Sequence, residues 1–382
     1  MSSTDVAAAR SGLSAARFVR PRLRELDAYH LEQSECRYKL DQNEVPWDMP
    51  RRLKARVTER LLECNWAGYP DFHSDRLRAA LAAHHGRQTA EVLVGNGSNE
   101  LLGIALEAVG RSGGEVLGCL PSFGLYEMFV RRASAVSRFL APRPDLGLQI
   151  DELSAEIDRD PTRPVILCSP NNPTGAAATV EQVQGLLERL RAPLLLDNAY
   201  GEFCRYDYRP LLDRFDNLLL FRTFSKAWSL GGMRLGDLFA SADLIAELIK
   251  VKLPYNLNHA ASLSGLVALE EAAVAERRVR VLIARRQQWR DMLLDFGFEV
   301  PPSEGNFLLA GTAKIAASQR RIGRGAANDG SQVVTRIRDG LAQRGILVRD
   351  VSGYPGLAGC LRVAVGSGPA LRAVRQALEE IL

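Results

Sequence analysis

Two stretches of sequence, LLLDNAY (194–200) and LLLFRTFSKAWSLGGMR (218–234), decide the fold. Each begins with an apolar run of strand length and continues into a loop that contains polar residues. Continuous apolar runs of this length are typical of strands that are buried on both faces of a parallel sheet. Ligands collect at the carboxyl ends of such strands, so the loops that follow the two runs are candidate sites.

The alternation of apolar runs with helical periodicity extends outward from these stretches in both directions. Strands are expected at Val92–Val94, Glu115–Cys119, Pro164–Cys168, Pro193–Leu196 and Leu218–Arg222. This alternation predicts an α/β protein with a mainly parallel sheet. The segment 258–296 has a helical pattern and would lead into a second, smaller domain, whereas 312–332, rich in Gly, Ala, Ser and Arg, is expected to be a surface loop.

The charge balance bears on the kinds of partner that the chain can have. Its 382 residues include 49 Lys and Arg against 45 Asp and Glu, a formal net charge of +4. Interspersed charges of both signs give no electrostatic basis for binding a nucleic-acid backbone or an anionic membrane surface. No segment approaches the roughly 20 apolar residues that span a bilayer, and the first residues lack the apolar run of a signal peptide. We therefore expect no nucleic-acid or membrane partner and a cytoplasmic location.

Cysteine usage gives no sign of a metal centre. The six cysteines are scattered, without a Cys-x-x-Cys pair or a nearby histidine. Neither a metal site nor a disulfide framework is expected from this pattern, and we interpret the cysteines as reduced packing residues.

Lysine is rare in this chain, so each lysine needs a reason. Only six of the 49 basic residues are lysines, and Lys226 lies between hydroxyl and aromatic residues in the loop after 218–222. A lysine in an apolar pocket can lose its proton and form an imine, whereas arginine stays protonated. A lone lysine is more often a surface charge. The neighbouring loops decide between these interpretations.

Two loops carry features that suit a flat, phosphorylated ligand. Gly97, Ser98 and Asn99 would place backbone N–H groups at a helix N-terminus, where phosphate binds well. An ordinary turn capped by Ser98 has the same sequence features. Phe123 follows the next strand and could stack on a ring or simply pack in the core.

Two further loops supply polar groups at fixed positions. Asn172 lies in a rigid, proline-containing loop, and Asp197 ends a buried strand. A buried carboxylate needs a cationic partner, which could be a protonated pyridine nitrogen or an arginine. Lys226 completes the set together with Tyr200 and Arg234, and the combination describes a pyridoxal phosphate site.

The ordered motifs resemble those of the fold-type I pyridoxal phosphate aminotransferases. They are Gly97-Ser-Asn-Glu100, Asn172-Pro-Thr-Gly175, Asp197-x-Ala-Tyr200, Ser225-Lys226 and Arg234. Lys39–Glu44, Gly68–Asp71, Ser303–Phe307, Gly345–Arg349 and Gly359–Arg362 are similar to the histidinol-phosphate aminotransferase branch. The resemblance implies a three-layer sandwich with a mainly parallel sheet plus a smaller α+β C-terminal domain. The implied boundaries are an N-terminal arm at 1–48, a large domain at 49–257, and an interdomain helix with the small domain at 258–382.

The resemblance also implies roles for single residues around pyridoxal 5'-phosphate. Lys226 would form the imine and shuttle protons, and Asp197 would keep the ring nitrogen protonated. Tyr200 and Asn172 would hydrogen-bond the ring oxygen, and Phe123 would stack on the ring. The expected phosphate contacts are Gly97, Ser98, Asn99, Thr223, Ser225 and Arg234, with Tyr69 contributed by the partner subunit of a homodimer with shared active sites.

The resemblance further implies substrate contacts at Tyr29, Asn43, Arg349 and Arg362. Two arginines and a phenol suit a phosphate. The implied reaction transfers an amino group from L-histidinol phosphate to a 2-oxo acid, 2-oxoglutarate. An aromatic amino-acid aminotransferase and a threonine-phosphate decarboxylase remain alternatives on the same fold. A non-catalytic sensor is a third alternative, against which the intact Lys226 and Asp197 argue.

Overall fold

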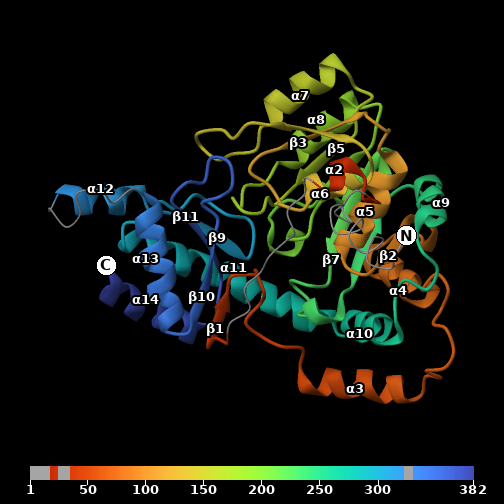
Figure 1. Cartoon of the computed structure of the whole chain (residues 1–382). Helices are drawn as coiled ribbons and strands as arrows, with labels where there is room; N and C mark the ends of the chain where they lie inside the picture. Colours follow the sequence, from red (N-terminus) through yellow and green to blue (C-terminus); the bar gives the residue numbers. More distant parts are fainter. Residues whose placement is uncertain (1–17, 25–34, 322–329) are drawn as a thin grey trace, which may run out of the picture.

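The computed structural model describes residues 18–24, 35–321 and 330–382, which form two sheets with their helices (Figure 1). The larger sheet has seven strands in the order β2-β8-β7-β6-β5-β3-β4. The strands are β2 (Val92–Gly95), β3 (Glu115–Cys119), β4 (Val136–Leu140), β5 (Val165–Cys168), β6 (Leu194–Asp197), β7 (Leu218–Thr223) and β8 (Gly236–Phe239). Only β8 runs antiparallel to its neighbours, so the predicted mainly parallel sheet is confirmed.

The apolar runs are buried because both faces of this sheet are covered by helices. In β6, Leu194 and Leu196 face one core, whereas Leu195 faces the other. The first core is completed by α4 (Asp75–His85), α7 (Ile150–Arg159), α8 (Val180–Arg189) and α10 (His259–Glu270). The second core is completed by α5 (Ser98–Val109), α6 (Tyr126–Arg132) and α9 (Ala242–Val251). The result is a three-layer sandwich, as predicted.

The smaller sheet has four strands in the order β1-β10-β11-β9. They are β1 (Tyr38–Leu40), β9 (Phe307–Gly311), β10 (Ile346–Asp350) and β11 (Cys360–Ala364). A separate core forms between this sheet and α11 (Ala272–Asp295), α13 (Gly330–Gln343) and α14 (Gly368–Ile381). Trp289 of α11 is fully buried in that core. The strand β1 pairs in parallel with β10, so the N-terminal part of the chain supplies an edge of the C-terminal sheet.

Two sequence-based expectations need correction. The helical segment 258–296 is two helices, α10 and α11, because the backbone leaves the helical conformation at Glu271. The predicted loop at 312–332 is wrong over α12 (Ala313–Arg321), where Ile315 and Ala316 pack into the smaller core. Ala and Lys favour a helix there. Residues 322–329 lie outside the described residues.

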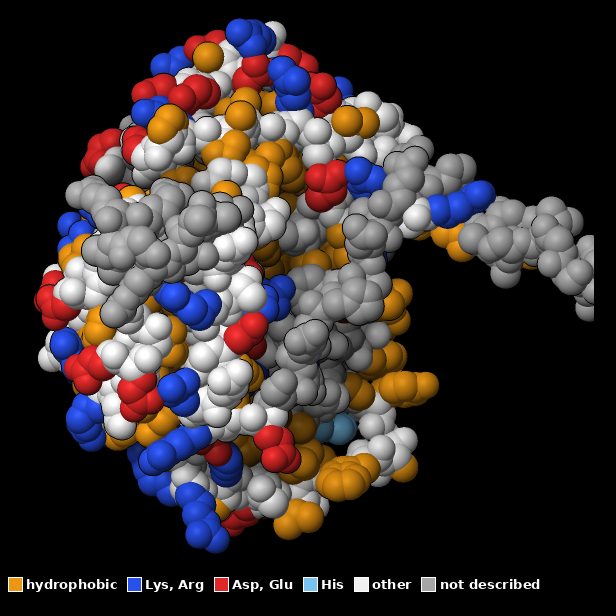
Figure 2. All heavy atoms as spheres, turned by 60° about the vertical axis from the view of Figure 1, so that its left-hand side comes forward, with side chains coloured by type: hydrophobic (Ala, Val, Ile, Leu, Met, Phe, Trp, Pro, Cys, Tyr) orange, Lys and Arg blue, Asp and Glu red, His pale blue; other side chains and the backbone are white. Residues whose placement is uncertain are grey.

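The remaining described α-helices are α2 (Pro21–Arg24) and α3 (Arg51–Leu62), the latter packed against α10. Figure 2 shows positive and negative side chains interspersed over the described part of one face, in keeping with the small net charge. Within the described ranges no helix combines the length and the apolar character that crossing a bilayer requires. The same ranges hold no group of three or more His, Cys, Asp or Glu side chains arranged for a metal ion, and all six cysteines are free.

Candidate active site

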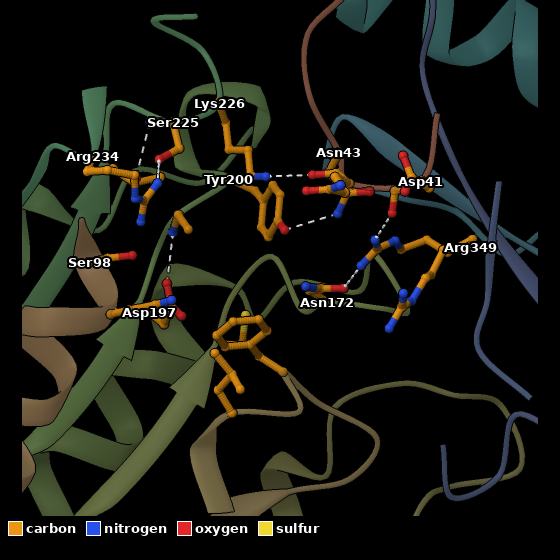
Figure 3. A pocket seen from close by; sticks show the side chains of 18 of the residues that line it. Asp41, Asn43, Ser98, Asn172, Asp197, Tyr200, Ser225, Lys226, Arg234 and Arg349 are labelled. Atoms are coloured by element: carbon orange, nitrogen blue, oxygen red, sulfur yellow. Dashed lines mark hydrogen bonds between the residues drawn. The ribbon is translucent and has the colours of Figure 1, made fainter. Parts of the chain in front are cut away.

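A pocket of about 260 Å³ lies between the carboxyl ends of β5, β6 and β7 and the smaller sheet (Figure 3). It brings together thirteen of the residues predicted from the sequence. They are Asn43, Ser98, Asn99, Phe123, Asn172, Asp197, Tyr200, Thr223, Ser225, Lys226, Arg234, Arg349 and Arg362. The pocket therefore lies at the carboxyl ends of parallel strands, where ligands of such sheets usually bind.

Three predicted residues do not line this pocket. Gly97 precedes the lining residue Ser98, and the Arg234 guanidinium occupies the space that a side chain on Gly97 would fill. Tyr69 is 81% exposed and stacks on Tyr255, with the ring centroids 4.5 Å apart. Tyr29 lies outside the described residues. The contribution of Tyr69 to a neighbouring subunit stays a prediction.

Lys226 lies in the turn after β7, with its amine inside the pocket. Its Nζ donates a hydrogen bond to the backbone oxygen of Gln42 at 2.7 Å. Burial, reinforced by the positive charge of Arg362, lowers the pKa of Lys226 from 10.5 to about 8. A substantial fraction of this amine is therefore neutral near physiological pH, as a nucleophile or base requires.

Asp197 ends β6 and is 4% exposed. Its Oδ2 accepts a hydrogen bond from the hydroxyl of Tyr126 at 2.7 Å, and its Oδ1 accepts one from the backbone N–H of Ala199 at 3.1 Å. Burial raises the pKa of Asp197, and the two donors oppose that shift. None of the ion pairs among the described residues involves Asp197, so the alternative of an arginine salt bridge is not found there.

The turn between β2 and α5 forms a cradle with the loop before β8. Gly97 has a φ of +79°, and Ser98 is the first residue of α5. The N-cap position of this helix belongs to Gly97, which has no side chain, and not to Ser98, so the interpretation as a turn capped by Ser98 is not supported. A Cβ on Gly97 would lie 2.5 Å from Nη2 of Arg234. The backbone N–H groups and the guanidinium therefore approach each other only because the side chain is absent.

Hydroxyl groups extend this cradle toward Lys226. Arg234 donates to the Oγ of Ser225 at 3.3 Å, and the Thr223 hydroxyl accepts from the Ser225 backbone N–H at 3.1 Å. No carboxylate of the described residues forms an ion pair with Arg234, so its charge is available to an anion. A helix N-terminus, hydroxyls and one guanidinium are together suited to a phosphate group.

The opposite side of the pocket orients two polar groups. Asn43 donates from Nδ2 to the Tyr200 hydroxyl at 3.0 Å, which leaves the Tyr200 proton for a ligand. Arg362 donates to the Oδ1 of Asn172 at 2.5 Å, which leaves the NH2 group of that amide for a ligand. Arg362 also donates to the backbone oxygen of Asp41. The contacts of Asn43 and Arg362 thus orient the Tyr200 hydroxyl and the Asn172 NH2 group as donors to a ring oxygen.

Arg349 and Arg362 are directly opposite each other in the antiparallel pair β10 and β11. Both line the pocket, and Figure 3 shows Arg349 on the side away from Ser98 and Arg234. The pocket therefore has two cationic ends. Several pocket residues, Asp41, Gln42, Leu125 and Tyr354, were not predicted, and neither was the role of Tyr126 beneath it. Asp41 and Gln42 lie within Lys39–Glu44, and Leu125 and Tyr126 follow Phe123 in the run 121–126, so the sequence held a signal for these four and none for Tyr354.

The pocket suits pyridoxal 5'-phosphate in three respects. Asp197 is a buried carboxylate without a described ion-pair partner, so a protonated ring nitrogen would satisfy it. The glycine cradle would accept the phosphate, and Lys226 is an amine of lowered pKa. An amine and a carboxylate held in this way on a mainly parallel three-layer sandwich define the class of fold-type I pyridoxal phosphate enzymes.

Comparisons with known proteins identify the family within this class. The chain belongs to the class I and II aminotransferase family, whose sequence model matches residues 37–381. These enzymes transfer amino groups and depend on pyridoxal 5'-phosphate, so the predicted class and cofactor are confirmed. The chain is 32% identical to a histidinol-phosphate aminotransferase of Caldanaerobacter subterraneus subsp. tengcongensis, over 95% of this chain and 98% of that one. It is 33% identical to the one of Chlorobaculum parvum, over 91% and 93%.

Solved structures confirm the fold. A histidinol-phosphate aminotransferase of Sinorhizobium meliloti in complex with pyridoxal 5'-phosphate superposes with a TM-score of 0.81 at 21% identity, covering 96% of this chain and 98% of that one. An L-threonine-O-3-phosphate decarboxylase of Porphyromonas gingivalis gives a TM-score of 0.71 at 22% identity, covering 90% and 98%. At such identities the likeness extends to the architecture alone.

Proposed function

We propose that this aminotransferase moves an amino group from L-histidinol phosphate to 2-oxoglutarate, giving imidazole acetol phosphate and glutamate, a step of histidine biosynthesis. The observation that carries the proposal is the pairing of Arg349 with Arg362 in the pocket wall. The names of the relatives at 32% and 33% identity support it. A cytoplasmic location and a homodimer with shared sites belong to the same proposal.

The two arginines impose an electrostatic cost that an anionic substrate would relieve. Like charges directly opposite each other on neighbouring strands destabilise a sheet. A phosphate carries close to two negative charges at neutral pH and has oxygens for two guanidinium groups. A single carboxylate supplies half of that charge. The arginine pair therefore favours a substrate that carries a phosphate at the end remote from the amino group.

The cofactor would be held by the residues already described around the pocket. Ser98, Asn99, Thr223, Ser225 and Arg234 would hold its phosphate, with Tyr69 of a second subunit as a further contact. Asp197 would pair with the ring nitrogen, Tyr200 and Asn172 would donate to the ring oxygen, and Phe123 would cover one face. When bound, pyridoxal phosphate supplies the electron sink that makes the amino-bearing carbon of the substrate acidic.

Lys226 is the residue in position to move the proton. Its Nζ lies between the cradle and the arginine pair, and its lowered pKa lets the neutral amine accept a proton from the amino-bearing carbon of the substrate. Arg362 contributes in two ways. It attracts the anionic substrate, and its charge adds to the burial that lowers the pKa of Lys226.

Competing substrates provide the test. Turnover of histidinol phosphate, phenylalanine and threonine phosphate is measured with 2-oxoglutarate as the acceptor, for the wild type and for Arg349→Ala. We expect histidinol phosphate to have the highest kcat/KM. Arg349→Ala should lower that value about 10- to 100-fold, the magnitude of a lost charge-assisted hydrogen bond. Its effect on phenylalanine should be much smaller.

Arg344→Ala is the matched control, because Arg344 contacts Glu380 on the surface and does not line the pocket. It should leave all three substrates unchanged. Preferred turnover of phenylalanine with no response to Arg349→Ala would show that the phosphate assignment is wrong. Release of carbon dioxide from threonine phosphate at a higher rate than amino transfer would favour the decarboxylase alternative.

A further inference from the structure

Tyr126 is a buried phenol that contacts two of the residues expected to hold the cofactor ring. It begins α6, is 2% exposed and lies beneath the pocket without lining it. Its hydroxyl donates to Oδ2 of Asp197 at 2.7 Å. Its ring meets that of Phe123 edge to face, with centroids 5.5 Å apart and planes at 82°. One side chain therefore touches both the ring-stacking residue and the carboxylate.

The hydrogen bond has a fixed direction over the physiological pH range. Burial, together with the negative charge of Asp197, raises the pKa of Tyr126 well above its usual value, so the phenol stays a donor. Cys168 of β5 also faces this contact, and burial raises the pKa of its thiol, which stays neutral. Tyr200 is the other phenol beside Asp197, and its pKa is raised by burial as well. Tyr126 is the group that donates a side-chain hydrogen bond to the carboxylate.

We propose that Tyr126 is a positioning residue that keeps Asp197 ionised and oriented, so that the proton between Asp197 and the cofactor ring nitrogen stays on the nitrogen. The proposal rests on the pyridoxal phosphate site proposed above. A donor to a carboxylate stabilises its charged form and makes it a weaker base. Without the phenol, the carboxylate would compete better for the shared proton, the ring nitrogen would lose positive charge, and the ring would withdraw fewer electrons.

Tyr126→Phe tests this in the holoenzyme, because it removes one hydroxyl and keeps the ring packed against Phe123. The first readout is the pH midpoint at which the visible absorbance of the bound cofactor changes. A less positive ring makes the attached nitrogen more basic, so we expect this midpoint to rise by about one pH unit, in line with a hydrogen bond to a charged group. Activity is not needed for this measurement.

The second readout compares two ligands on the same variant. Pyridoxal phosphate should bind about tenfold or more weakly to Tyr126→Phe than to the wild type. The carbocyclic analogue, which has a C–H in place of the ring nitrogen, should show little or no loss, because it offers Asp197 no proton to share. Equal losses for both ligands would mean that the hydroxyl only supports packing, which would overturn the proposal.

Tyr208→Phe is the control for loss of a buried phenol. Tyr208 is 1% exposed, and its hydroxyl is hydrogen-bonded to Ala178 and Ser169 and not to the carboxylate of Asp197. It should lower stability without moving the midpoint. A wild type with no visible band would overturn the proposed function together with this inference. A normal band with an unmoved midpoint in Tyr126→Phe would overturn the inference alone.

Should Tyr126→Phe fail to fold, 3-fluorotyrosine placed at position 126 keeps the shape and gives a more acidic, stronger donor. The midpoint should then move downward relative to the wild type. An upward shift, or none, would contradict the proposal.

Discussion

Lys226 combines a charge with a half-buried position, and that combination has a cost in folding as well as a use in chemistry. The lowered pKa, about 8 against 10.5, arises first from burial and then from Arg362. A difference of this size corresponds to about 3 kcal/mol at pH values where the amine is protonated. A variant without the amine would also lose the hydrogen bond to Gln42, which contributes about 1 kcal/mol.

Replacing this lysine should therefore stabilise the cofactor-free protein. We expect Lys226→Met to raise the free energy of unfolding by about 2 kcal/mol at pH 7. The direction of the pH dependence of unfolding follows from the lowered pKa of Lys226 in the folded state. Between about 8 and 10.5 the unfolded chain holds the proton more strongly than the folded one, so wild-type stability rises over that interval and the advantage of the variant disappears.

Urea unfolding at pH 7 and pH 10.5 measures both effects. Lys250→Met is the matched control, because Lys250 is exposed and forms a surface ion pair with Glu247. Its difference from the wild type should be the same at both pH values. A destabilised Lys226→Met at pH 7 would show that burial of the ammonium group is not unfavourable here.

At the scale of elements, the phosphate cradle depends on how closely β8 approaches the start of α5. A Cβ on Gly236 would lie 2.3 Å from the backbone nitrogen of Ser98. That nitrogen is one of the donors at the helix N-terminus, and it cannot move without displacing the first turn of α5. The contact therefore connects packing of the sheet to the geometry of the anion site.

Gly236→Ala should lower both stability and cofactor affinity. Forcing a methyl group into this contact is expected to cost about 1–3 kcal/mol in the free energy of unfolding. The dissociation constant of pyridoxal phosphate should rise about tenfold or more, because the N–H donors are displaced. Chemical unfolding and a fluorescence titration with the cofactor measure the two effects.

Gly103→Ala serves as the control for this change. Gly103 lies in the middle of α5, and a Cβ there would meet no atom within 4 Å. Alanine favours a helix over glycine by up to about 1 kcal/mol, so this variant should be as stable as the wild type or more so. Unchanged cofactor binding in Gly236→Ala would show that the cradle tolerates the displacement.

Most elements could be predicted because strands buried on both faces read as unbroken apolar runs. The runs at 194–196 and 218–222 appear in β6 and β7 within a residue of the expected bounds. The helix α12 was missed because 312–332 was interpreted as one segment, in which the Gly and Ser residues resemble a loop, although the Ala and Lys residues of 313–321 favour a helix.

In the site, side chains that follow strand ends were predictable, and contacts set by register or by the backbone were not. Arg349 and Arg362 were each identified, but their opposition depends on the pairing of β10 with β11. The acceptor for Lys226 is a backbone oxygen of Gln42, which leaves no trace in the sequence. Tyr126 depends on how α6 folds back beneath β6.

At the scale of the whole molecule, exposed aromatic side chains bear on the proposed homodimer. Tyr69 is 81% exposed and Trp66 is 70% exposed, and Leu253 near Tyr255 is 72% exposed. Apolar side chains gathered in this way often mark an interface. If Tyr69 serves the pocket of a second subunit, each site needs residues from both chains.

Mixing two impaired variants tests the sharing of sites. Lys226→Ala and Tyr69→Ala are each expected to have little activity, the second through weaker cofactor binding. After subunit exchange, a hybrid dimer would have one site with both native residues, so activity should reappear. The mixture of Lys226→Ala with Arg234→Ala is the control, because both residues line the same pocket and no native site can form. No recovery in the first mixture would contradict shared sites.

The pairing of β1 with β10 also determines when the site can be completed during folding. Leu40 pairs with Val348, so β1 has no partner strand in this sheet until the chain has been synthesised as far as β10. Gln42 and Asn43 follow β1 directly and contact Lys226 and Tyr200. Contacts between such distant segments form slowly, because the intervening chain must first be ordered. On the ribosome, the large sheet can therefore assemble with its lysine in place before the pocket has its second wall, and competence for catalysis is gained only as the last strands emerge.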